Sequence, residues 1–129
     1  MSKDQVDSKS GKSEVVHAFE FDSVYANNTR FEPSVWDLKI LFGELMQHTG
    51  KESVNWHTAV TVPWMQIKIL DYYLRVNIAF HEIQNGAIRT HPNVTPPKPE
   101  PPSAEKISEN PLAPKLYEAA LKIHLEMFG

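Results

Sequence analysis

The apolar residues between positions 63 and 85 predict a long helix with two apolar sides. At about 100° per residue, the first stripe on this helix consists of Ile67, Leu70, Leu74 and Ile78. The second stripe consists of Met65, Ile69, Tyr72, Val76, Phe80 and Ile83. A narrow charged strip is left for water, formed by Lys68, Asp71, Arg75 and Glu82. A small sheet can cover only one stripe, so the second stripe is predicted to be a homodimer interface.

Three segments before this helix alternate between apolar and polar residues, as half-buried strands do. They are residues 15–31, 35–45 and 54–62. Because short polar connections join them, we expect neighbouring strands to pair antiparallel. Gly50 lies in the polar loop 47–53 and is expected to supply the positive φ of a hairpin. The predicted fold is α+β, an antiparallel meander of three to four strands followed by a long helix (β-β-β-α).

Proline and glycine mark the two ends of the long helix. Pro63 lies where the first turn begins, a position that tolerates its missing N–H. Gly86 follows the last periodic residue, as a C-terminal capping glycine does. The helix is therefore predicted to extend from about Pro63 to Asn85.

A second helical pattern occupies the C-terminal residues 111–129. Its apolar face is predicted to bind a partner protein through Tyr117, Leu121, His124 and Phe128. Helices that dock in grooves place their anchors at this i, i+3, i+4 spacing. The alternative is that this face covers the chain's own sheet or the dimer seam.

The composition divides the chain into four parts. Residues 1–13 are polar and are predicted to be a disordered tail, and residues 14–88 form the core domain. Residues 89–110 hold six of the ten prolines and are predicted to be a Pro-rich linker to the C-terminal helix. A core domain of this size is only marginally stable alone, which also favours a homodimer.

Charge and residue usage exclude several classes of function. The net charge is −3 and the charges are scattered, so nucleic acid is not expected as a partner. The chain has no cysteine, which excludes disulfides and thiolate metal sites. It shows no secretion signal and no run of 18 apolar residues, so a cytoplasmic protein without a membrane partner is predicted.

Two short motifs resemble a known family. Residues 24–31 (VYANNTRF) and 36–43 (WDLKILFG) resemble the first strand pair of a small bacterial domain family of unknown function. In that family a Tyr-Ala-Asn strand leads to a strand ending in Phe-Gly, and a third strand enters a long helix through Ser-Pro-Glu. This chain has Val62-Pro63-Trp64 there, without the capping hydroxyl or the first-turn acid. The resemblance covers residues 21–86 and implies a β-β-β-α domain, with no known activity or catalytic residues.

The polar residues show no catalytic or metal-binding spacing. The six histidines include no i, i+4 pair and no His-Glu-x-x-His motif. His17 and His57 are the best candidates for a functional histidine, because each lies in an alternating segment. The acids near the strands are expected to form the wet face of the sheet; they are Glu20, Asp22, Glu32, Asp37 and Glu44. No catalytic residue, metal or cofactor is therefore predicted.

Two functions fit this sequence. The first is a non-enzymatic, homodimeric protein-interaction module, in the form of a peptide-binding or chaperone-like adaptor. In it, Trp36, Trp56 and Trp64 serve as core or interface anchors or line a peptide groove. The alternative is a small enzyme or ligand-binding protein with a pocket at the dimer interface, built from His57, Tyr25 and nearby acids.

Overall fold

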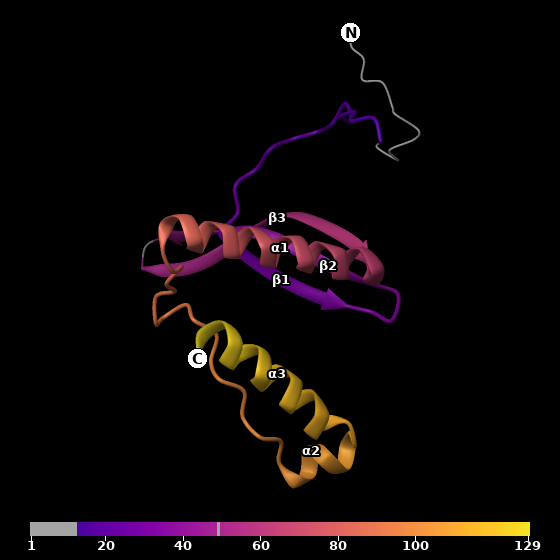
Figure 1. Ribbon diagram of the computed structural model, residues 1–129, viewed down its shortest axis with the longest axis vertical. Coiled ribbons are helices and arrows are strands. Elements are labelled where there is room, and N and C mark those ends of the chain that lie inside the picture. Colours follow the sequence, from indigo (N-terminus) through magenta and orange to yellow (C-terminus); the bar gives the residue numbers. More distant parts are fainter. Residues whose placement is uncertain (1–12, 49) are drawn as a thin grey trace. The chain divides into compact units, whose positions relative to one another are not determined.

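The computed structural model describes residues 13–48 and 50–129. The chain divides into two compact units, Met1–Val76 and Asn77–Gly129, and one continuous helix crosses the boundary. The elements, in chain order (Figure 1), are β1 (Asn28–Pro33), β2 (Asp37–His48), β3 (Lys51–Pro63), α1 (Trp64–Asn85), α2 (Ala104–Glu109) and α3 (Ala113–Phe128). Nearly all of the predicted tail 1–13 lies outside the described residues.

The strands form one antiparallel sheet in the order β1-β2-β3. Phe31, Ile40 and Val60 lie opposite one another across the three strands and share one face. This sheet, with α1 directly after it, confirms the predicted α+β class and the β-β-β-α order.

The first predicted strand was wrong for residues 15–27, which form no strand. Asn27 ends the β1–β2 pairing: its backbone N–H donates to the Gly43 carbonyl at 3.0 Å. Its side-chain Oδ1 accepts from the Leu45 N–H at 2.9 Å, where another residue of β1 would otherwise offer a carbonyl. Alternation alone does not make a strand, because a strand also needs a neighbour with free backbone groups.

The hairpin between β2 and β3 is longer than the sequence indicated. Both strands extend into the predicted polar loop, and only residues 49 and 50 lie between them. Gly50 has a φ of +79°, which confirms the predicted positive φ. Backbone pairing in this hairpin therefore tolerates polar side chains that face water.

An irregularity in β3 changes which side chains share a face. Phe42 pairs with Thr58 and Gly43 pairs with Trp56, so His57 is an extra residue without a partner in β2. Such a bulge moves all residues beyond it to the other face. Trp56 therefore faces away from the side of Thr58, whereas the alternation had placed both on one face.

The bulge seats the Trp56 ring against Gly43. A Cβ added at Gly43 would lie 2.7 Å from Trp56 Cε3 and 2.8 Å from the Asn55 carbonyl oxygen. Real Cβ atoms do not approach other atoms so closely. Glycine is thus required at this position by the half-buried indole ring and the neighbouring backbone.

Helix α1 begins one residue later than predicted and ends as predicted. Pro63 is the last residue of β3, and α1 starts at Trp64. The indole Nε1–H of Trp64 donates to the Ser34 carbonyl at 2.9 Å, which ties the start of α1 to the turn between β1 and β2. Gly86 has a φ of +94° and its N–H donates to the Glu82 carbonyl, which confirms the C-terminal cap.

The described residues bury very few side chains. Ile40, at 7% exposure, is the one buried hydrophobic residue among them. Within the first stripe of α1 only Ile67 is half-buried, and Leu70, Leu74 and Ile78 are exposed.

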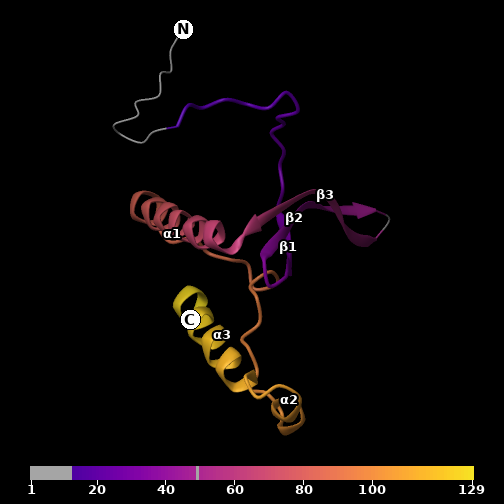
Figure 2. The ribbon, with the colours of Figure 1, turned by 90° about the vertical axis from the view of Figure 1, so that its right-hand side faces the viewer.

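The second unit contains a helix that the sequence analysis did not predict. Helix α2 lies inside the predicted Pro-rich linker, and the Ser103 hydroxyl caps it by accepting from the Lys106 N–H at 3.3 Å. The segment 95–102 runs beside α3 in both views (Figures 1 and 2). No helix in the described part of the chain is long and apolar enough to cross a membrane.

Candidate functional site

A hollow of about 570 Å³ lies beside the bulge in β3. The chain before β1 contributes one wall, β2 another, and the bulge in β3 the third. The lining residues are Glu20, Asp22, Val24, Tyr25, Glu44, His57 and Thr58. The bulge thus brings a histidine and a hydroxyl to the same hollow as a tyrosine and three acids.

Both ring nitrogens of His57 contact the chain itself. Nε2 lies 2.9 Å from the Tyr25 carbonyl oxygen, and Nδ1 lies 2.8 Å from the Thr58 hydroxyl. A carbonyl only accepts, so the Nε2–H of His57 donates to the Tyr25 carbonyl, while Nδ1 is occupied by its hydrogen bond with the Thr58 hydroxyl. His57 therefore holds the chain before β1 against β3, and neither nitrogen is free to bind a metal or take a proton from a substrate.

The charge of the hollow is negative. Its lining includes three carboxylates and neither lysine nor arginine. Such a wall favours a ligand with a positive charge or several hydrogen-bond donors. No group of three or more His, Asp and Glu side chains within residues 13–48 and 50–129 is arranged to hold a metal ion.

Part of this site was visible in the sequence. The alternative function named Tyr25, His57 and nearby acids, and the structure brings these residues together. The role of Thr58 was missed, because the bulge that turns it toward His57 has no clear sequence signal. His17 is not in the lining; its ring stacks on Phe21 with centroids 4.5 Å apart.

The second stripe of α1, predicted as the dimer interface, is accessible along its whole length. Met65 at one end is 79% exposed and Ile83 at the other end is 81% exposed. Between them Ile69, Tyr72 and Phe80 are also exposed, and only Val76 is half-buried. The hydrophobic surface predicted for the interface is therefore present on the outside of the single chain.

The predicted partner-binding face of α3 is turned toward the chain's own Pro-rich segment. His124 Nε2–H donates to the Pro96 carbonyl at 2.8 Å, and its ring lies 5.2 Å from that of Phe128. Tyr117 and Leu121 are half-buried. Any protein that binds this face has to displace the segment or bind at its margin.

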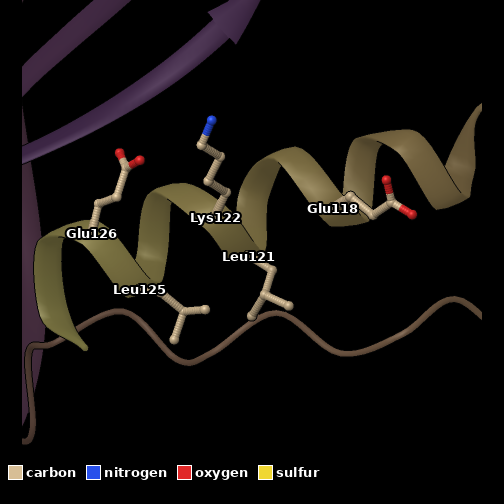
Figure 3. Close-up of a pocket in the computed structure, with 5 residues that line it drawn as sticks. All are labelled: Glu118, Leu121, Lys122, Leu125 and Glu126. Carbon is tan, nitrogen blue, oxygen red and sulfur yellow. The ribbon is translucent and has the colours of Figure 1, made fainter.

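Two further surfaces on α3 are open. A shallow hollow of about 430 Å³ follows one side of the helix, where Leu121 and Leu125 point the same way (Figure 3). A separate apolar side of α3, which was not predicted from the sequence, is formed by Leu116, Ile123 and Met127, all exposed. Their spacing of seven and four residues places them on one side of a helix, and this spacing was the sequence signal that could have identified them.

No family model, curated protein sequence or solved structure matches this chain.

Replacing His57 by Ala is expected to lower the free energy of unfolding by about 1 kcal/mol, because the substitution removes two exposed hydrogen bonds. Urea denaturation at a fixed chain concentration measures this loss. Nitrogen NMR shifts of the His57 ring in the unaltered protein should report protonated Nε2. A protonated Nδ1 with a free Nε2 would contradict the structural role.

Proposed function

We propose that this chain is a non-enzymatic, homodimeric protein-interaction module, a peptide-binding or chaperone-like adaptor. The observation that supports this proposal is the second stripe of α1, which is apolar from Met65 to Ile83 and faces solvent in the single chain. Contiguous apolar surface of this extent is typical of protein-interaction sites.

Association also supplies the burial that the single chain lacks. Burying a leucine, isoleucine or phenylalanine side chain is worth ~1.5–3 kcal/mol. Five of the six side chains of the second stripe are exposed, so this energy is not gained there in the single chain. A second copy that covers the second stripe adds several such side chains to a shared core.

The homodimer is tested by light scattering on the full chain. We expect twice the chain mass of 14.7 kDa at micromolar concentration. A mass of one chain over the whole micromolar range would overturn the homodimer.

We infer that a protein partner binds to α3, with Tyr117, Leu121, His124 and Phe128 as the proposed contacts. The shallow hollow lined by Leu121 and Leu125 supports recognition by this helix, because it leaves part of this face open to a partner. The hydrogen bond from His124 to Pro96 supports the alternative, a structural helix.

Deletion of residues 111–129 distinguishes these roles. If α3 serves recognition, the truncated chain keeps its unfolding midpoint and its dimer mass, and a protein that co-purifies with the full chain is lost. A drop of several kcal/mol, or loss of the dimer, would instead show a structural helix. As matched substitutions, Leu121→Ser should weaken partner binding, whereas Ile123→Ser, which changes an exposed side chain on a separate side of α3, should leave it unchanged.

A second candidate is a ligand-binding protein, favoured by the hollow beside His57. Its three carboxylates suit a small organic cation. Addition of a diamine such as putrescine should then shift the amide NMR signals of Tyr25, Glu44 and Thr58 with saturation. Unchanged signals at millimolar diamine would argue against this function.

A further inference from the structure

The spacing of the second stripe is nearly the same when α1 is read in either direction. Counted from Leu74, Met65 and Ile83 lie nine residues to either side, and Tyr72 and Val76 lie two residues to either side. Ile69 and Phe80 lie five and six residues away. An antiparallel second helix packed on this stripe, with its midpoint at the level of Leu74, therefore opposes an apolar residue to each of these six.

The charged strip is also complementary to itself when a second copy of α1 runs antiparallel. On the helix surface it lies about 100° from the middle of the second stripe, so it flanks an interface built on that stripe. A two-fold axis between antiparallel helices brings the same flank of both helices together. Lys68 then lies near Glu82 of the second copy, and Asp71 near its Arg75. The two-fold axis repeats each of these two contacts, so all four contacts join opposite charges.

A parallel helix pair would lose this match. In a parallel two-fold pair the charged strips of the two helices lie on opposite sides of the interface, so Lys68 and Glu82 have no opposite charge of the strip across from them. Within one helix Asp71 and Arg75 already pair at 3.2 Å, and both side chains are more than half exposed, so they remain accessible to a second copy.

We propose that α1 binds a second copy of itself in antiparallel orientation, with the two-fold axis between Tyr72 and Val76, at the level of Leu74 along the helix. This inference rests on the proposed homodimer and specifies its geometry. The contact from Met65 to Ile83 covers about 27 Å of helix at 1.5 Å per residue. Charge complementarity selects the antiparallel second copy as the occupant of the second stripe.

Cysteine cross-linking tests the orientation directly, because the natural chain has no cysteine. Met65→Cys and Ile83→Cys change two highly exposed side chains, so neither variant removes core packing. The two full-length variants, carrying tags of different mass, are co-expressed and oxidised. We expect the mixed 65–83 disulfide, and little of either the 65–65 or the 83–83 species.

The outcomes separate the inference from the homodimer itself. A dimer by light scattering that yields 65–65 and 83–83 disulfides would show parallel helices. A dimer that yields no disulfide would place the interface elsewhere, for example at an open strand edge. Either result overturns the antiparallel inference and leaves the homodimer intact, whereas a single-chain mass overturns both.

Charge reversal provides an independent test. Lys68→Glu and Glu82→Lys should each weaken the dimer roughly 3- to 30-fold, since each reversal alters two contacts in the symmetric pair. The double variant should recover most of the original affinity. The two residues lie about 21 Å apart along one helix, so recovery requires contact between chains.

Lys51→Glu, an exposed reversal in β3, serves as the matched control and should leave the dimer affinity unchanged. If the double variant is as weak as the sum of the single variants, Lys68 and Glu82 do not meet, and the antiparallel register is excluded.

Discussion

Replacing Val76 by Glu is expected to convert the dimer into single chains. In the proposed pairing Val76 packs on Tyr72 of the second copy, close to the two-fold axis. The substitution places two carboxylates in this apolar contact, where each loses water without gaining a partner. We expect the dissociation constant to rise roughly 100-fold or more, as measured by sedimentation over a range of chain concentrations.

Gln84→Glu is the control for this substitution. It adds the same charge to α1, at an exposed position between the two stripes. This variant should associate like the natural chain. If Val76→Glu still forms a dimer of unchanged affinity, the second stripe does not form the interface.

Replacing Gly43 by Ala is expected to lower the free energy of unfolding by about 2–3 kcal/mol, at the upper end of the effect of overpacking. The new Cβ would meet the Trp56 ring, the Val54 side chain and the Asn55 carbonyl oxygen, all within 2.8 Å. The ring and the valine can rotate away, but the carbonyl belongs to the hydrogen-bonded sheet. Urea denaturation at a fixed chain concentration measures the change.

Ser53→Ala provides a comparison in the same hairpin, since Ser53 is exposed and its replacement creates no close contact. Its unfolding midpoint should stay near that of the natural chain. Equal midpoints for Gly43→Ala and Ser53→Ala would show that the Trp56 ring does not pack on this part of β2.

The order of elements could be predicted from the sequence, because side-chain alternation and helical spacing are local signals. Pro63 and Gly86 marked the two ends of α1 to within one residue. The bulge at His57 could not be predicted, since it depends on the register against β2. The same is true of the end of β1, which depends on the Asn27 side chain reaching the Leu45 N–H.

The candidate site was predicted only in part, for the same reason. Tyr25 and His57 are 32 positions apart, and only a hydrogen bond across the sheet joins them. On α3, spacing correctly identified one apolar face, but it did not show that the Pro-rich segment runs along this face. Spacing describes which residues share a side of a helix, and says nothing of what covers that side.

The meander has a consequence for the order in which the chain folds. Each strand pairs with its neighbour in the chain, and residues 49 and 50 alone separate the two longest strands. Contacts between residues close in sequence form quickly, because little chain entropy is lost when their ends meet. All partners of the sheet are therefore present once β3 has been synthesised, before any residue of α1 is needed. A sheet that needs no later segment leaves residues 64–129 free of any role in its pairing.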